Sequence, residues 1–294
     1  MKTLLVGNFG ARNVGDEMIL ASALERCPDA IVMSADSSFS QRFQEKKFQT
    51  VLPFPTGFRS WIRFLSHPEG TLRERKGTVD RIIFPGGGLL AIKDRAWWIW
   101  GSTIVGLRKM FPEARMEMEA QGIDVPKNDW QKFWLNRVIV AMNSITVRDE
   151  ASAEVIYSFG SRAEVVGDAV ENFLKDISLE KERKFQTTNY KLQTSKKEFV
   201  LVNARAKFTG EWPKADIFIA MEPNDARWVP EDFPGKVFFP DTVREALEVF
   251  GSAKVVIGQR LHFLIMAKAC GCSEIRTLGD PYAEKVKNWL ERQE

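Results

Sequence analysis

Short apolar segments alternate with amphipathic segments of helical period along most of this chain, and this alternation restricts its fold more than any other feature. The segments 3–8, 81–88 and 254–259 (TLLVGN, RIIFPGGG and KVVIGQ) have the length and composition of buried strands. Helical patterns follow, for example at 16–27 and 260–271. A strand, a helix and a further strand form the βαβ unit, so we predict an α/β fold with mostly parallel sheets.

The alternating pattern occurs twice, and a polar segment separates the two occurrences. We predict an N-terminal Rossmann-like domain over 1–170, a charged linker over 171–198 and a C-terminal Rossmann-like domain over 199–294. The second domain is shortened, because KFTGEWPKA (207–215) cannot supply the crossover helix that normally joins two parallel strands. Two such domains facing a cleft would bind ligands outside the carboxyl ends of their strands.

Charge and cysteine content argue against several classes of protein. Lys and Arg number 42 against 39 Asp and Glu, and the net charge of +3 is too small to indicate a nucleic-acid partner. Three cysteines are too few for a disulfide framework, and Cys270 and Cys272 lack companion ligands for a metal site. No signal-peptide pattern opens the sequence, and its longest apolar run is about half of a membrane span. We predict a cytoplasmic protein without a metal.

Glycines and polar side chains occur where strands pass into helices, which is where backbone N–H groups and a helix dipole can hold an anion. Two such junctions are GNFGARNVGD (7–16) and PGGG (85–88). Their candidate substrate contacts are Asn8, Gly10, Asn13, Gly15, Asp16, Gly86, Gly87 and Gly88. The spacing in the first junction differs from the G-x-G-x-x-G of dinucleotide folds. A tight turn with Asp16 as the N-cap of the next helix would explain the same residues.

A third junction, GQRLHFLIMAKACG (258–271), places two polar side chains at the start of an otherwise apolar helix. His262 is one of two histidines in the chain, and Arg260 precedes it by two positions. They can face one ligand only if Arg260 lies at or before the helix cap. Arg148 is a second arginine at a strand end, although an ion pair with Asp149 would explain it, and a lone histidine on such a helix is more often a core residue.

The order and intervals of these motifs resemble those of the polysaccharide pyruvyl transferase family. The motifs are GNFGARNVGDEMIL (7–20), PGGGLL (85–90), EAQGI (119–123), TVRDEASAEVI (146–156), VVGDA (165–169) and VVIGQRLHFLIMA (255–267). The resemblance runs from the first strand to about Tyr282. It implies two Rossmann-like domains in the GT-B arrangement and an enzyme that moves the enolpyruvyl unit of phosphoenolpyruvate onto two sugar hydroxyls as a cyclic ketal.

The same resemblance assigns roles to residues of this chain. Arg148, Arg260 and His262 would bind phosphoenolpyruvate and act in catalysis, and Leu261 would lie in the binding site. Phosphoenolpyruvate is then the donor substrate without a further cofactor, and the acceptor is a glycan or lipid-linked glycan in cell-surface polysaccharide synthesis. Ketal formation needs a proton shuttle and anion clamps, which suits one histidine and two arginines independently of the family name.

Two other functions stay open, because the sequence departs from the family pattern. Ala169 stands where the family usually has proline, CGC at 270–272 replaces glycine-proline, and the match around Asp280 is partial. A GT-B glycosyltransferase could hold the diphosphate of a nucleotide sugar at the glycine junctions. A noncatalytic relative could keep the fold with a shortened second domain. The sequence identifies neither the acceptor sugar nor the oligomeric state.

A basic and aromatic segment, GFRSWIRFLSHPEGTLRERKG (57–77), interleaves arginines with phenylalanine and tryptophan. Such a segment can rest on an anionic membrane, which would place the protein peripherally at the inner face and suit a lipid-linked acceptor. An amphipathic helix that covers a core is the more common explanation of the pattern.

Overall fold

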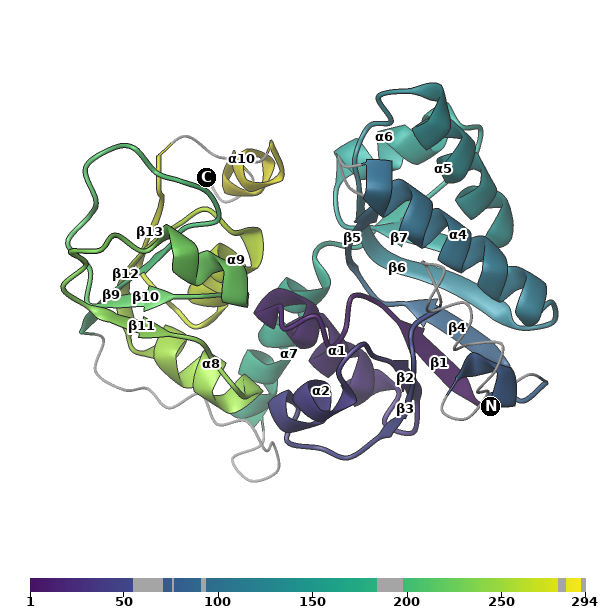
Figure 1. Ribbon diagram of the computed structural model, residues 1–294, viewed down its shortest axis with the longest axis horizontal. Helices are drawn as coiled ribbons and strands as arrows, with labels where there is room; N and C mark the ends of the chain where they lie inside the picture. The colour runs from purple at the N-terminus through teal and green to yellow at the C-terminus, as the bar shows by residue number, and fades with distance from the viewer. Residues whose placement is uncertain (55–70, 76, 91–93, 184–197, 280–283, 292–294) are drawn as a thin grey trace. The chain divides into compact units, whose positions relative to one another are not determined.

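The chain forms two units in the computed structural model, which describes residues 1–54, 71–75, 77–90, 94–183, 198–279 and 284–291 (Figure 1). Unit 1 comprises Met1–Ala11, Ile19–Gln41 and Lys46–Ala169, and unit 2 comprises Arg12–Met18, Arg42–Glu45 and Val170–Glu294. The main change of unit thus falls one residue before the predicted end of the first domain. Each unit is built on a parallel sheet, which confirms the predicted α/β class.

Eight described strands form the sheet of unit 1, in the order β3-β2-β1-β4-β6-β7-β8 with β5 paired to β6. All of these pairs are parallel. The order reverses between β1 and β4, and such a reversal is where open α/β sheets provide room for a ligand. The strands are β1 Thr3–Val6, β2 Ile31–Met33, β3 Gln49–Val51, β4 Arg81–Phe84, β5 Gly87–Leu90, β6 Arg115–Ile123, β7 Ser144–Val147 and β8 Glu164–Val165.

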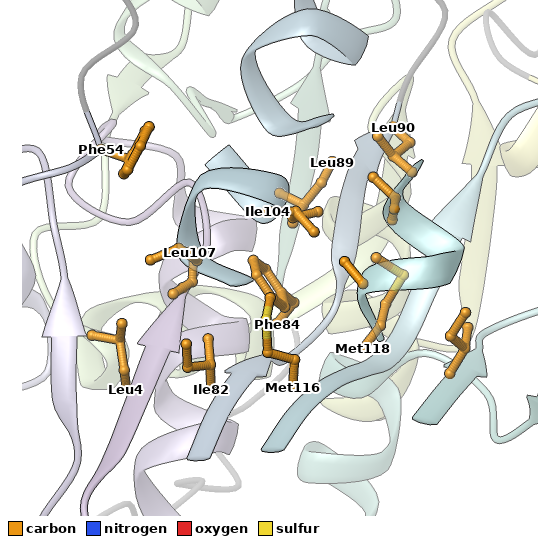
Figure 2. Packing of buried hydrophobic residues seen from close by; sticks show 14 of the residues in the cluster. Leu4, Phe54, Ile82, Phe84, Leu89, Leu90, Ile104, Leu107, Met116 and Met118 are labelled. Carbon is orange, nitrogen blue, oxygen red and sulfur yellow. The ribbon is translucent and has the colours of Figure 1, made fainter. Parts of the chain in front are cut away.

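Helices cover both faces of this sheet, with α4, α5 and α6 on one face and α1 and α2 on the other (Figure 1). The helices are α1 Val14–Arg26, α2 Ser37–Phe43, η1 Leu72–Arg75, α4 Asp94–Met110, α5 Asp129–Ala141 and α6 Glu150–Ser158. Figure 2 shows Ile104 and Leu107 of α4 packed over strand residues such as Phe84 and Met116. The main core of unit 1 therefore lies between α4 and the central strands.

The segment ARMEMEAQG (114–122) predicts a strand with alternating buried and exposed faces, but the corresponding central strand β6 does not alternate. Only Arg115 is exposed and Glu119 half-buried, while the other seven residues are buried. Glu117 is among the buried ones and forms ion pairs with Arg81 and Arg115. The acidic residues of this strand suggest a solvent-facing side, but the ion pairs with Arg81 and Arg115 compensate the buried charge of Glu117.

Unit 2 has a five-stranded sheet in the order β11-β10-β9-β12-β13, again with parallel pairs. The order reverses between β9 and β12. The strands are β9 Phe199–Asn203, β10 Ile217–Ile219, β11 Lys236–Phe238, β12 Ala253–Gly258 and β13 Glu274–Thr277, and the helices are α7 Ala169–Arg183, η2 Pro223–Trp228, α8 Val243–Gly251, α9 Leu261–Ala269 and α10 Glu284–Glu291. The segment predicted as a linker is thus helical as far as Arg183.

The connection between β9 and β10 contains no helix, as the sequence predicted. Aromatic rings of the loop cover the sheet instead: Phe208 meets Trp212 edge-on at 5.8 Å, and Trp212 lies 6.4 Å from Phe218 of β10. Phe233 contacts Phe218 from the following loop at 6.3 Å. Large rings bury enough apolar area to replace a crossover helix on this face. The shortened second domain therefore keeps a closed core.

We predict that Trp212→Ala lowers the free energy of unfolding by about 2–3 kcal/mol. This is less than the ~3–5 kcal/mol typical of a fully buried aromatic residue, because Trp212 is half-buried. Trp98→Ala, on the exposed side of α4, should change it by less than ~0.5 kcal/mol. Urea denaturation of the two variants measures the difference, and equal losses would contradict a covering role for the loop.

Candidate functional site

The start of α9 in unit 2 places Arg260 where the sequence argument required it. Arg260 is the N-cap residue of the helix, with an extended backbone at φ −97° and ψ 130°. Strand β12 ends at Gly258, so only one residue separates the strand from this cap. Arg260 and His262 therefore stand at the carboxyl end of a strand next to the reversal of strand order, where ligands of such sheets bind.

The guanidinium of Arg260 is held by a buried carboxylate. Its Nε donates to Oδ2 of Asp225 at 2.7 Å and its Nη2 to Oδ1 at 2.5 Å, which is a bidentate pair. The same carboxylate accepts from the backbone N–H of Met221 at 3.0 Å and from Nδ2 of Asn203 at 3.3 Å. Because four donors converge on Asp225, its orientation and that of Arg260 are fixed.

A second carboxylate, that of Glu222, reaches the same arginine from a more exposed position. Its Oε1 lies 2.5 Å from Nη2 of Arg260, and its Oε2 accepts from Nδ2 of Asn13 at 3.3 Å. The side chain of Glu222 is 32% exposed, whereas that of Asp225 is 1% exposed. A ligand that approaches from solvent therefore meets Glu222 before Asp225.

Burial and these carboxylates act in opposite directions on Arg260. Burial is the largest single influence and disfavours the charged guanidinium, but the hydrogen bonds and charges of Asp225 and Glu222 together outweigh it. The pKa of Arg260 is therefore raised above its ordinary value, and the side chain stays charged. One guanidinium and two carboxylates give the group a formal charge of −1.

Asn13, rather than Asp16, caps α1. Its Oδ1 accepts from the backbone N–H of Asp16 at 3.2 Å, and the helix begins at Val14. The predicted N-cap at Asp16 is wrong because the helix starts almost one turn earlier. Asp16 instead lies in the first turn of α1, where the helix dipole interacts favourably with a negative charge. The backbone N–H of Val14 donates to Met221 at 2.8 Å, which joins this turn to the loop that carries Glu222.

Gly15 lies against the imidazole of His262, within the first turns of α1 and α9. A Cβ atom at position 15 would clash with Nδ1, Cγ and Cβ of that histidine. Gly15 therefore leaves the space that the imidazole occupies. The sequence analysis predicted a substrate contact for Gly15, and its neighbour in the structure is the side chain of His262. Leu261, another predicted substrate contact, is buried.

Gln259 is a residue of the site that the sequence analysis missed. It is buried, and its Oε1 accepts from the backbone N–H groups of Arg205 at 2.8 Å and Ala206 at 3.1 Å. Its Nε2 donates to the carbonyl of Leu278 at 3.2 Å. One side chain thus ties the ends of β9 and β13 to β12 beside Arg260. The only sequence signal for it is a polar residue at a buried strand end.

Arg148 belongs to unit 1, whereas Arg260 and His262 belong to unit 2. Its side chain is 6% exposed and its Nε donates to Oδ2 of Asp149 at 3.1 Å, which is the ion pair that the sequence left open. Oδ2 of Asp168 lies 3.9 Å from Nη1. The guanidinium rests on the backbone of Gly122, because a Cβ there would clash with it. Arg148 is thus positioned at the carboxyl edge of the unit 1 sheet.

Asp149 also caps α6, since its Oδ1 accepts from the N–H and hydroxyl of Ser152. Burial is the largest single influence and raises its pKa, yet the hydrogen bonds from Ser152 and the charge of Arg148 together outweigh burial. The pKa of Asp149 is therefore lowered, and the residue remains a carboxylate that can hold Arg148.

The glycine junctions of unit 1 contain backbone conformations that favour glycine. Gly86 and Gly87 have φ of 126° and 97°, which side chains rarely adopt, and Gln121 donates to the carbonyl of Gly86 at 2.7 Å. Gly10 has φ 75° and packs against the turn after β2, so a tight turn explains it. Asn8 and Gly88 are exposed. The predicted contacts thus divide into Asn8, Gly10, Gly86, Gly87, Gly88 and Arg148 in unit 1 and Asn13, Gly15, Asp16, Arg260, Leu261 and His262 in unit 2.

Within the described residues, no three His, Cys, Asp or Glu side chains are grouped as metal ligands, and no helix has the length and apolarity to cross a membrane. Most of the basic and aromatic segment at 57–77 and the region of Asp280 lie outside the described residues.

A model of the polysaccharide pyruvyl transferase family matches residues 13–273, from the cap of α1 to beyond α9. The chain belongs to this family. It is therefore a transferase, and the family's name connects it with polysaccharide synthesis. The matched range contains all three of the residues predicted to act in catalysis. A search of the curated proteins finds no match to this transferase.

Several solved structures share the fold of this pyruvyl transferase family member. UDP-GlcNAc 2-epimerase from Neisseria meningitidis bound to UDP-GlcNAc has a TM-score of 0.58 and 12% identity, with 99% of this chain and 91% of that chain covered. The Methanocaldococcus jannaschii UDP-GlcNAc 2-epimerase has a TM-score of 0.58 and 12% identity, with 99% and 87% covered. Anabaena Alr3699/HepE in complex with UDP-glucose has a TM-score of 0.57 and 12% identity, with 100% and 90% covered. These likenesses show a GT-B-type fold.

We predict that Gly15→Ala displaces the His262 imidazole, because the new Cβ would clash with Nδ1 and Cγ of the ring and with the Cβ that carries it. With two histidines in the chain, NMR signals of the imidazoles can be assigned with a His67→Gln variant. The His262 signals should shift in Gly15→Ala and those of His67 should not. Gly101→Ala is a matched control, because its new Cβ would clash with the Trp134 ring in unit 1. This variant should leave the His262 signals unchanged. Unchanged His262 signals in Gly15→Ala would contradict the contact.

Proposed function

We propose that the chain transfers the enolpyruvyl group of phosphoenolpyruvate to two hydroxyls of a glycan or lipid-linked glycan acceptor in cell-surface polysaccharide synthesis. Family membership supports the reaction class. One observation supports a location for this reaction. Arg260, the N-cap of α9, is fixed by the buried carboxylate of Asp225, and His262 lies in the first turn of the same helix.

The start of α9 suits an anionic donor. The helix has no acidic residue in its first turn, and Arg260 makes no side-chain cap hydrogen bond. The first N–H groups of a helix lack intrahelical partners, and together with the helix dipole they favour an anion. Phosphoenolpyruvate brings a phosphate and a carboxylate, and an arginine fork binds either group through two hydrogen bonds.

Glu222 occupies the position on Arg260 that the donor anion would take. The carboxylate of Glu222 lies on Nη2 of Arg260. Asp225 would stay, because it is buried and holds Nε as well as Nη2. The guanidinium therefore keeps its direction while one carboxylate replaces another. This exchange limits the reorganisation that binding requires.

The proposed reaction uses His262 as the proton carrier. The C3 methylene of phosphoenolpyruvate gains a proton and becomes methyl, and one acceptor hydroxyl bonds to the resulting cation at C2. The second hydroxyl then bonds to C2 as the C2–O bond to phosphate breaks. One hydroxyl proton replaces the proton delivered to C3 and the other leaves with phosphate, so atoms and charge balance. Imidazole is suited to such transfers near neutral pH.

Nucleotide-sugar chemistry is the second candidate, because the UDP-GlcNAc 2-epimerase from Neisseria meningitidis and Anabaena Alr3699/HepE were solved with UDP-sugars. A glycosyltransferase of this fold would hold a diphosphate at the glycine junctions. A noncatalytic relative would bind a ligand without turnover. The identity of the bound donor distinguishes a glycosyltransferase from the proposed pyruvyl transferase. Measurable turnover distinguishes the proposed enzyme from a noncatalytic relative.

We predict that phosphoenolpyruvate, and neither UDP-sugars nor NAD, raises the thermal stability of the protein. At ~100 times its Kd the ligand should add ~2.7 kcal/mol of stability. Arg260→Lys keeps a positive charge but loses the fork, so most of this gain should disappear. Arg276→Lys, at an exposed arginine of the same unit, should keep it. Stabilisation by a UDP-sugar without any by phosphoenolpyruvate would instead support the glycosyltransferase.

We predict that His262→Gln lowers turnover by about 10²–10⁴-fold while phosphoenolpyruvate still stabilises the protein, because the variant loses proton transfer and keeps the anion site. Turnover is measured as phosphate released from phosphoenolpyruvate with a panel of p-nitrophenyl glycosides as acceptors. His67→Gln, at the other histidine of the chain, is the matched control. Full turnover by His262→Gln would exclude it as the proton carrier.

A further inference from the structure

Tryptophan is concentrated on two neighbouring helices of unit 1. Of nine tryptophans in the chain, five lie on α4 and α5: Trp97, Trp98, Trp100, Trp130 and Trp134. Trp97 is a core residue, but Trp98 is 41% exposed, Trp130 is 49% exposed and the adjacent Phe133 is 46% exposed. Single exposed apolar residues are ordinary, whereas a contiguous aromatic group on a surface indicates an interaction.

Contacts between the two helices place their aromatic side chains at neighbouring levels of α4 and α5. Oδ1 of Asp94, the first residue of α4, accepts from Gln131 in the first turn of α5 at 2.7 Å, so the helices start side by side. Gly101 of α4 packs on the ring of Trp134, which brings Trp98, one turn earlier, to the level of the first turns of α5.

The rings of α5 contact one another at 5.3 to 6.1 Å between centroids, Trp130 and Trp134 edge-on and Trp130 and Phe133 stacked. We call Trp98, Trp130, Phe133 and Trp134 the aromatic patch.

Basic side chains surround the aromatic patch. Lys132 and Arg137 are exposed on α5, and the guanidinium of Arg137 lies 5.3 Å from the centre of the Phe133 ring. Arg95 is exposed on α4. Around the patch these three basic residues stand against Asp94 and Asp129, a net charge of +1, and Lys132 pairs with Asp129 at 3.3 Å. The complementary partner is therefore anionic as well as able to accept aromatic rings.

We propose that the aromatic patch is a membrane contact that inserts its rings among the headgroups of an anionic bilayer. Tryptophan is favoured at this depth because its ring is apolar and its N–H is polar, and basic residues beside it add attraction to anionic lipids. A glycan would be bound in a concave site, whereas the patch lies on the outward faces of two helices.

The patch lies at the same edge of the unit 1 sheet as Arg148. Helix α4 follows β5 and α5 follows β6, so both helices start at the carboxyl edge of the sheet. The patch lies at these helix starts, on the same edge as Arg148 and the PGGG junction. A bilayer that receives the patch therefore lies near this edge, which suits an acceptor carried on a lipid. The membrane contact itself does not depend on the proposed donor.

The test is co-sedimentation of the purified full chain with phosphatidylcholine vesicles, with and without about 30% phosphatidylglycerol. Binding should require the anionic lipid and weaken at high salt. The double variant Trp130→Ala/Phe133→Ala should bind at least tenfold less, as should Lys132→Glu/Arg137→Glu. Tyr157→Ala removes a 75% exposed aromatic side chain on α6 and should bind like the wild type. Unfolding temperatures confirm that each variant is folded.

Three results would overturn the proposal. The wild-type chain could fail to bind anionic vesicles, or the Trp130→Ala/Phe133→Ala variant could bind them as tightly as the wild type does. In the third, the wild-type chain is a dimer in sedimentation velocity and the same double variant is a monomer, which would assign the patch to a second copy of the chain.

Discussion

The bidentate pair between Arg260 and Asp225 organises the carboxyl edge of the unit 2 sheet. A buried guanidinium is stable only when its charge is compensated, and removal of one partner of such a pair typically costs about 3–5 kcal/mol. Asp225 also receives donors from Asn203 at the end of β9 and from Met221 after β10. The pair thus connects two strand ends to the cap of α9, and the position of His262 follows from that cap.

Arg148 in unit 1 is held in a comparable way. Each arginine has one carboxylate hydrogen-bonded to Nε, Asp149 for Arg148 and Asp225 for Arg260, and a second carboxylate near another nitrogen. Side chains fixed before a ligand arrives lose little conformational entropy on binding, and both arginines are fixed in this way. Arginine retains donors beyond those used in a bidentate pair, which allows one side chain to be structural and to bind ligand.

Local features were predictable from the sequence and long-range partners were not. The periodicity of apolar residues revealed most strands and helices, and the strand end at Gly258 revealed Arg260 as the cap. The predicted linker also contains a helical pattern, since Val170, Phe173, Leu174 and Ile177 have helical spacing and are buried. The high charge of the segment favoured the interpretation as a linker. Asp225 pairs with a residue 35 positions away, and such a pairing arises only when β10 and β12 flank β9.

The shortened second domain bears less on activity than its sequence suggests. What is missing is a helix on one face of the sheet, and Phe208 and Trp212 cover that face. The residues that hold Arg260 lie at the carboxyl edge and keep their hydrogen bonds. A buried ion pair is a weak source of stability, because apolar residues of similar volume are often as stabilising. Stability alone therefore does not account for Asp225 and Arg260, and the proposed binding of an anion at the start of α9 would account for both.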